Sequence, residues 1–220
     1  MATESLEKAR FNMVQQQIRP WDVFDQRVLG ILETLPRDGF VPETYLDLAY
    51  ADIEIPIGSG QQMMFPRIEA RMMQALDVQP DDSILEIGTG SGYLTACLAK
   101  LGARVVSLDI RAEFTEQAAG RLAAHGIENV ELQTGDGLSA PHASGPFDVI
   151  AVTGSLPELP DMLKQQLTVG GRMFAVCGES PAMEACLITR VGDDAWRTEG
   201  LFETELAVLD NAPEPERFEF

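Results

Sequence analysis

The stretch LEIGTGSGYL, residues 85–94, constrains the fold of this chain more than any other part of the sequence. An apolar run leads into a turn in which Gly88, Gly90 and Gly92 alternate with small polar residues. Glycine tolerates left-handed backbone and allows close approach of the main chain to a ligand or to another element. In open parallel sheets such a turn follows a strand, and ligands bind at the carboxyl ends of the strands. The stretch therefore predicts a strand, a helix and a ligand site at their junction, although the same turn also suits close helix–strand packing without a ligand.

From Ser83 onward, short apolar runs alternate with helical stretches. We expect strands at 83–87, 103–110, 129–133, 147–152, 171–177, 184–191 and 201–209, and helices near 92–101, 112–125 and 159–167. Short apolar strands separated by helices indicate an α/β protein with a mostly parallel sheet covered on both faces.

The first eighty residues have a different pattern. Stretches 5–18, 22–35 and 67–78 carry apolar residues at helical spacing, and prolines separate them. The intervening stretch 39–66 is rich in proline and glycine, and we expect it to be mostly loop. At the other end of the chain, the polar tail leaves Phe218 and Phe220 as residues that could dock on the core.

Composition excludes several classes of function. The chain has 220 residues and a net charge of −19, so it suits one acidic domain that would repel nucleic acid. No run approaches the roughly 20 apolar residues that span a bilayer, and the N-terminus lacks a signal-peptide core, so we expect a cytoplasmic protein without a membrane partner. Two histidines and three scattered cysteines give no pattern typical of a metal site or a disulfide framework.

The glycine spacing helps to choose the ligand. A dinucleotide fingerprint requires glycine or alanine where Tyr93 stands, and no lysine follows as in a phosphate-binding P-loop. S-adenosylmethionine remains the best candidate, with a nicotinamide enzyme or a non-enzymatic binding module as the less favoured alternative. Glu86 could accept hydrogen bonds from the ammonium group of S-adenosylmethionine. Asp109, about twenty residues past the first glycine, suits its ribose hydroxyls. Asp136 could accept from the adenine amino group, and Gly137 would let the ring lie close.

Several blocks in sequence order resemble the protein-L-isoaspartate O-methyltransferases, which are class I methyltransferases. Besides LEIGTGSGY and GDG, they are MVQQQI, VLGILETLPRDGFVPE, AYADIEIPIGSGQ, FDVIAVTG and LKQQLTVGGRM. The resemblance covers roughly residues 10–180. It implies a Rossmann-like, seven-stranded, mostly parallel sheet with helices on both faces and an added N-terminal helical segment. It also implies methylation of the free α-carboxylate of isoaspartyl residues in damaged proteins, after which the ester collapses to a succinimide.

The resemblance also implies a division of the single domain and a set of cofactor-binding residues. The N-terminal helices and acceptor loop occupy residues 1–80, the cofactor-binding core 81–180, and the C-terminal strands and tail 181–220. The implied cofactor-binding residues are Gly60, Gln61, Glu86, Gly88, Thr89, Gly90, Gly92, Asp109, Ile110, Asp136 and Gly137.

The acceptor loop departs from the family. The family sequence GQTIS, followed one residue later by proline, is GQQMMFP here, so Gln62, Met63 and Met64 replace threonine, isoleucine and serine. Either the loop backbone holds the acceptor and its side chains vary freely, or the acceptor has changed, for example to a small molecule. The chain after residue 179 also matches the family poorly.

A carboxylate acceptor is already ionised at neutral pH and requires no general base, in keeping with the scarcity of histidine. Inside an acidic protein it would still need nearby cations. Arg67 and Arg71 follow the acceptor loop on one predicted helical face and are candidates for that role. The alternative is that both are surface arginines that pair with Glu69 or other neighbours.

Overall fold

The computed structural model describes residues 2–214, with the side chains described from Glu4, and the expected docking of Phe218 and Phe220 lies outside these residues. Its N-terminal third contains helices in the three predicted helical stretches, and a 3-10 helix at residues 43–48 lies where mostly loop was expected. The helices are α1 (Ala2–Asn12), η1 (Met13–Ile18), η2 (Arg19–Trp21), α2 (Gln26–Thr34), η3 (Arg37–Phe40), η4 (Glu43–Leu48) and α3 (Pro66–Leu76). Pro20 lies in the short turn that ends the first helical run, and the Asp25 carboxylate caps α2 by accepting from the backbone N–H of Arg27 at 2.8 Å.

A β-hairpin lies within the stretch that was expected to be loop. Strands β1 (Ile55–Gly58) and β2 (Gln61–Met63) pair antiparallel, and the turn places Ser59 and Gly60 at φ of 47° and 75°. Both strands are short, and β1 contains Pro56. Such strands carry almost no periodic signal, so the sequence pattern did not reveal them.

The main sheet has seven strands in the order β5-β4-β3-β6-β7-β8-β9, which confirms the expected fold class. The strands are β3 (Ser83–Ile87), β4 (Arg104–Asp109), β5 (Val130–Thr134), β6 (Phe147–Leu156), β7 (Leu167–Glu179), β8 (Ala182–Gly192) and β9 (Ala195–Glu203). The pairings from β5 across to β7 are parallel, whereas β8 and β9 add an antiparallel edge. The connecting helices are α4 (Tyr93–Leu101), α5 (Ala112–Ala124) and α6 (Asp161–Gln165).

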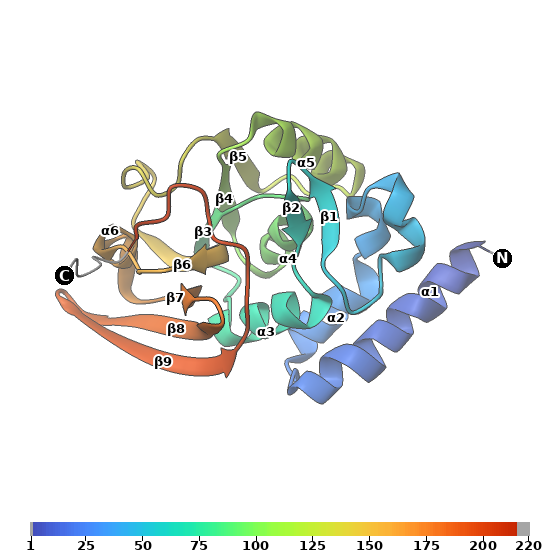
Figure 1. Ribbon diagram of the computed structural model, residues 1–220, viewed down its shortest axis with the longest axis horizontal. Helices are drawn as coiled ribbons and strands as arrows, with labels where there is room; N and C mark the ends of the chain where they lie inside the picture. Colours follow the sequence, from blue (N-terminus) through green and yellow to red (C-terminus); the bar gives the residue numbers. More distant parts are fainter. Residues whose placement is uncertain (1, 215–220) are drawn as a thin grey trace.

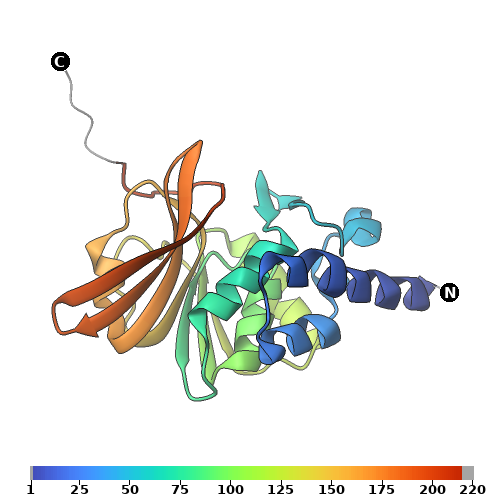
Figure 2. The same cartoon turned by 90° about the horizontal axis from the view of Figure 1, so that it is seen from below.

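The two faces of the sheet are covered unequally. The larger apolar cluster joins the N-terminal helices, α3, α4 and α5 to residues such as Ile84, Val149 and Phe174 on one face. The other face packs Leu85, Ile150 and their neighbours against the short helix α6 and irregular chain. Figures 1 and 2 show this bias, with α1, α2 and α3 gathered on one side of the strands.

The last strand differs from the prediction. A strand was expected at 201–209, but β9 ends at Glu203 and the following segment leaves the sheet edge. Figure 1 shows this segment running back across the sheet, where Val208 forms an isolated bridge with Ser155 of β6. Its apolar run at 206–209 predicted a strand, but this run packs over the sheet instead of extending it. We call residues 204–212 the C-terminal strap.

Candidate active site

A cavity of about 490 Å³ opens at the carboxyl ends of the central strands, a volume within the range of small-molecule sites. The chain order reverses there, because β4 and β5 lie on one side of β3 while β6 and β7 lie on the other. Ligands of open α/β sheets bind at such a switch point. The cavity therefore lies where the glycine turn predicted a site.

The glycine turn forms one wall with bare backbone. Gly88 and Gly90 line the cavity with φ of 98° and 50°. A Cβ on Gly88 would lie 2.1 Å from the hydroxyl oxygen of Thr153, so no side chain fits there. Gly92 has a different role, because it does not line the cavity and a Cβ on it would lie 2.9 Å from Ala118 of α5. The sequence correctly grouped these glycines in one turn but did not separate the cavity wall from the helix contact.

Two carboxylates occupy the ends of neighbouring strands at the cavity, as predicted. Asp109, after β4, accepts hydrogen bonds from the N–H groups of Gly90 at 2.9 Å and of Arg111 at 3.0 Å. Asp136, after β5, accepts from the N–H of Leu138 at 2.8 Å and from the side-chain amide of Asn211 at 3.0 Å. These bonds fix both carboxylates while leaving acceptor capacity for hydroxyl or amino groups of a ligand. Ile110 and Gly137 line the same cavity.

Glu86 lies behind the glycine turn, not at the cavity surface. It is fully buried, does not line the cavity, and accepts hydrogen bonds from the hydroxyls of Thr95 and Ser107. Burial raises the pKa of its carboxyl to about 8. The prediction of direct contact with a ligand ammonium finds no support in this geometry, since the side chain points into the protein interior. Thr89 is likewise buried and bonded to Ser107 at 2.6 Å.

The acceptor loop forms the opposite wall. Gln61, Gln62 and Met64 line the cavity, Met63 does not, and Gly60 lies in the hairpin turn. Both methionines are buried in the larger apolar cluster. Met64, at the position where the resemblance implies a serine, is therefore part of this wall.

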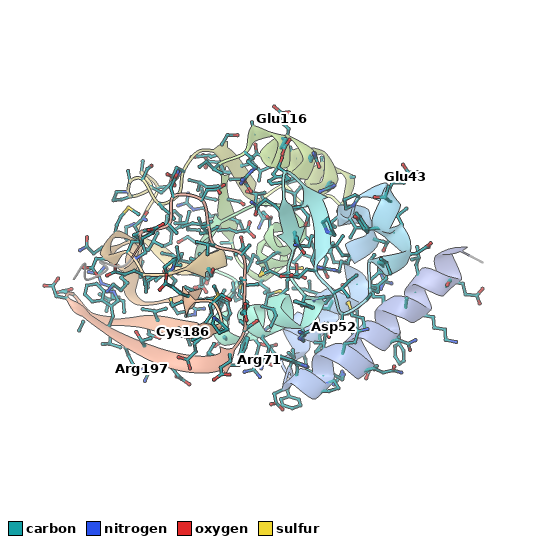
Figure 3. The ribbon with its side chains drawn as sticks, in the orientation of Figure 1. Glu43, Asp52, Arg71, Glu116, Cys186 and Arg197 are labelled. Carbon is teal, nitrogen blue, oxygen red and sulfur yellow. The ribbon has the colours of Figure 1, made fainter. Side chains whose placement is uncertain are left out.

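The arginines expected near an acceptor have other partners. Arg67 forms an ion pair with Asp52 and lies over the Phe65 ring at 4.1 Å. Arg71 donates to the carbonyl of Trp21 at 3.0 Å, and its guanidinium lies 4.9 Å from the ring centroid of Phe202. Figure 3 shows Arg71 beside the end of β9, and neither arginine lines the cavity. The alternative hypothesis, that both arginines pair with neighbouring residues, describes them better, although neither pairs with Glu69.

The C-terminal strap contributes a wall that sequence reasoning missed. Its residues from Glu205 to Asp210 line the cavity. Backbone hydrogen bonds tie it to β6, since Ser155 donates to the carbonyl of Ala207 at 2.8 Å and accepts from the N–H of Leu209 at 3.0 Å. Asp210 also forms an ion pair with Arg111 at 2.6 Å. No local motif marks this segment, because its place depends on contacts with strands distant in sequence.

The cavity is acidic overall. Besides Asp109 and Asp136, its walls include Glu54, Glu205 and Asp210. Burial raises the pKa of the Glu54 carboxyl, which Arg67 partly opposes. A ligand with positive charge is therefore favoured in this cavity, and an anionic group gains from a cation bound beside it.

The fold and the cavity together define a class. Acids at the ends of adjacent strands, bare glycine backbone and a Rossmann-like sheet with an antiparallel edge describe a nucleoside-binding α/β protein of the class I methyltransferase type. The family model described as "Protein-L-isoaspartate(D-aspartate) O-methyltransferase (PCMT)" matches residues 8–205. The chain belongs to this family.

Relatives and solved structures agree with that assignment. A protein-L-isoaspartate O-methyltransferase of Rhodopseudomonas palustris is 37% identical over 209 residues, which cover 92% of this chain and 96% of that protein. One of Methanoculleus marisnigri is 40% identical over 81% of each chain. A solved structure of a protein-L-isoaspartate O-methyltransferase is 26% identical with a TM-score of 0.79, covering 93% of this chain and 66% of that one. A Plasmodium falciparum structure, described as a putative member in complex with S-adenosyl-L-homocysteine, has a TM-score of 0.77 at 20% identity over 93% of this chain and 98% of that one, and shows the shared fold.

Proposed function

We propose that this protein transfers a methyl group from S-adenosylmethionine to the free α-carboxylate of isoaspartyl residues in damaged proteins. The family match over residues 8–205 carries the proposal. The cavity supports it, because it places the glycine turn and the Asp109 carboxylate opposite the acceptor loop. Described residues contain no helix that is both long and apolar enough to cross a membrane, and a cytoplasmic location stays a prediction.

The cofactor fits the residues present. We assign the ribose hydroxyls to Asp109, the adenine amino group to Asp136, and the amino-acid end to the bare backbone of Gly88 and Gly90. When bound, S-adenosylmethionine supplies an electrophilic methyl group on a positively charged sulfur. That positive charge offsets the acidic walls for an incoming carboxylate.

The protein then has a positioning task. The acceptor oxygen must approach the methyl carbon in line with the departing sulfur, so the wall formed by Gln61, Gln62 and Met64 has to hold the peptide at a fixed place. The acceptor carboxylate is ionised at neutral pH, and no side chain is needed to remove a proton. The aliphatic lining from Ile57 and Met64 limits water around the reacting atoms.

The small-molecule alternative is not favoured. The cited relatives carry the protein-L-isoaspartate name, and Met64 changes one side chain of a wall whose backbone is fixed. We expect the variant Met64→Ser to methylate an isoaspartyl peptide within about tenfold of the wild-type rate. If the wild type is inactive on the peptide and Met64→Ser is active, the small-molecule hypothesis would be favoured again.

The direct test is methyl transfer from labelled S-adenosylmethionine to an isoaspartyl peptide. The control is the same peptide with a normal aspartyl residue. Base-labile methyl ester formed only on the isoaspartyl peptide is the expected result. Ester formation no greater than that of the control peptide would reject the proposal.

A further inference from the structure

Arg37 is a fully buried residue whose guanidinium contacts both the acceptor loop and the first residue of α4. It comes from η3, a short turn outside the cavity lining. Its side chain is 0% exposed, and that of its ion-pair partner Glu69 in α3 is 3% exposed. Both Nη groups have hydrogen-bond partners, whereas Nε has none among the described residues. Because a buried charge is costly without partners, the contacts of the Nη groups show which elements the side chain joins.

One contact of Arg37 reaches the acceptor loop. The Nη2 group of Arg37 donates to the backbone carbonyl of Met64 at 2.8 Å, while Nη1 pairs with Glu69 in the first turn of α3. The planar fork therefore fixes the end of the acceptor loop against the start of the following helix. Met64 itself faces the cavity, so this hydrogen bond acts on the wall from behind.

The other contact reaches the helix that begins at the glycine turn. The Cζ atom of Arg37 lies 5.0 Å from the ring centroid of Tyr93, the first residue of α4 and the neighbour of Gly92. The Tyr93 ring is fully buried and packs edge-on against Phe40 at 5.5 Å. One side chain thus contacts both the acceptor loop and the helix that begins at the glycine turn.

Stability alone gives little reason for such a group. Replacing a buried ion pair with apolar residues of similar volume is often neutral or stabilising, because desolvation offsets the attraction of the charges. A side chain that contacts both the acceptor loop and the helix after the glycine turn has a further use. A displacement of about 1 Å between reactants can lower a rate on the order of a hundredfold.

We propose that Arg37 is a positioning residue that holds the acceptor loop at a fixed distance from the glycine turn. This inference rests on the proposed function for its kinetic part. Arg37 touches neither reactant, and it acts through the Met64 carbonyl and the Tyr93 ring. Its loss moves the wall relative to the turn while leaving the contacts of Asp109 in place.

Three variants test the proposal. Arg37→Lys keeps the charge beside Glu69 but loses the fork, because an ammonium is a point charge on a flexible stem. The double variant Arg37→Met with Glu69→Met removes both charges and is expected to melt near the wild-type temperature. Arg172→Lys is the matched control, because Arg172 is also a fork, holding the carbonyls of Leu76 and Asp77 at the far end of α3.

Three measurements distinguish positioning from a structural role. They are kcat and KM for the isoaspartyl peptide, the Kd of S-adenosylhomocysteine by calorimetry, and amide hydrogen exchange. We expect both Arg37 variants to lower kcat by roughly tenfold or more with a smaller change in KM. The Kd should stay within about twofold. Exchange should rise in residues 61–65 but not in β4, and Arg172→Lys should leave all three readouts unchanged.

Other outcomes would overturn the proposal. Wild-type kcat and wild-type exchange at 61–65 in both Arg37 variants would reduce Arg37 to a folding contact. A Kd that rises as much as kcat falls would place its action in the cofactor site. If the wild type makes no ester, the proposed function fails separately. Exchange then decides the positioning role, with a rise confined to 61–65 in support and a uniform rise against it.

Discussion

At the residue scale, the two acids nearest the glycine turn are both buried, but only Asp109 lines the cavity. Asp109 lies at the cavity surface with backbone N–H groups on its carboxylate, whereas Glu86 is enclosed and one of its oxygens lacks a hydrogen-bond partner among the described residues. Both were predicted as ligand contacts, because each follows or ends a strand. Sequence position alone does not show which way a side chain points in a strand that is buried on both faces.

The Asp109 carboxylate gives the first prediction. Asp109→Asn should weaken binding of S-adenosylhomocysteine by about 1–3 kcal/mol, because an amide replaces the charged acceptor of two ribose hydroxyls. Calorimetry measures the change. Glu116→Gln, on the outer surface of α5 in Figure 3, alters the net charge equally and should leave the Kd unchanged. Equal Kd values for wild type and Asp109→Asn would exclude the ribose assignment.

Glu86 predicts a pH dependence of stability. Burial raises its pKa in the folded state to about 8, against 4.5 for an ordinary glutamate. Between these values the folded state binds a proton that the unfolded state lacks, so the free energy of unfolding falls as pH rises, by about 1.4 kcal/mol per pH unit. Glu86→Gln removes this contribution, and urea unfolding from pH 5 to pH 8 should show a shallower decline than the wild type. Parallel curves for the two proteins would contradict a protonated Glu86.

At the element scale, the parts that sequence could predict are those with local signals. Strands β3 to β8 and their helices follow from apolar runs of about the right length, and the glycine turn marked the site between them. The β1–β2 hairpin and the C-terminal strap escaped prediction for a physical reason. Each is short or irregular, and each is held by contacts to segments far away in sequence, as in the bonds of the strap to Ser155.

The strap gives an element-scale prediction. The Leu209 side chain packs beside Gly154 and Gly88, so closely that a Cβ on Gly154 would lie 2.7 Å from it. Leu209→Ala should loosen this part of the wall, which its backbone still ties to β6, and weaken binding of S-adenosylhomocysteine about tenfold. Val169→Ala, at a valine that is 59% exposed, is the matched control. An unchanged Kd for Leu209→Ala would show that the strap does not close the site.

At the scale of the whole molecule, the net charge of the protein affects how readily charged peptide substrates bind. The net charge is −19, and the cavity walls repeat that acidity. Raising salt from about 0.01 M to about 0.1 M shortens the screening length from about 30 Å to about 10 Å. The KM for an isoaspartyl peptide with acidic neighbours should therefore fall with salt, and that for a peptide with basic neighbours should rise. Salt responses of the same sign for both peptides would contradict electrostatic selection.

The central claim joins fold, cavity and acceptor loop into one reaction at the strand ends. The most direct test of this claim measures methyl-ester formation on an isoaspartyl peptide and on the same peptide with a normal aspartyl residue. Each reaction contains labelled S-adenosylmethionine and either the wild-type protein or Asp109→Asn. The account predicts ester on the isoaspartyl peptide alone, at a rate that Asp109→Asn lowers when the cofactor is below saturation. Equal labelling of both peptides, or none of either by a wild type that binds S-adenosylhomocysteine, would contradict it.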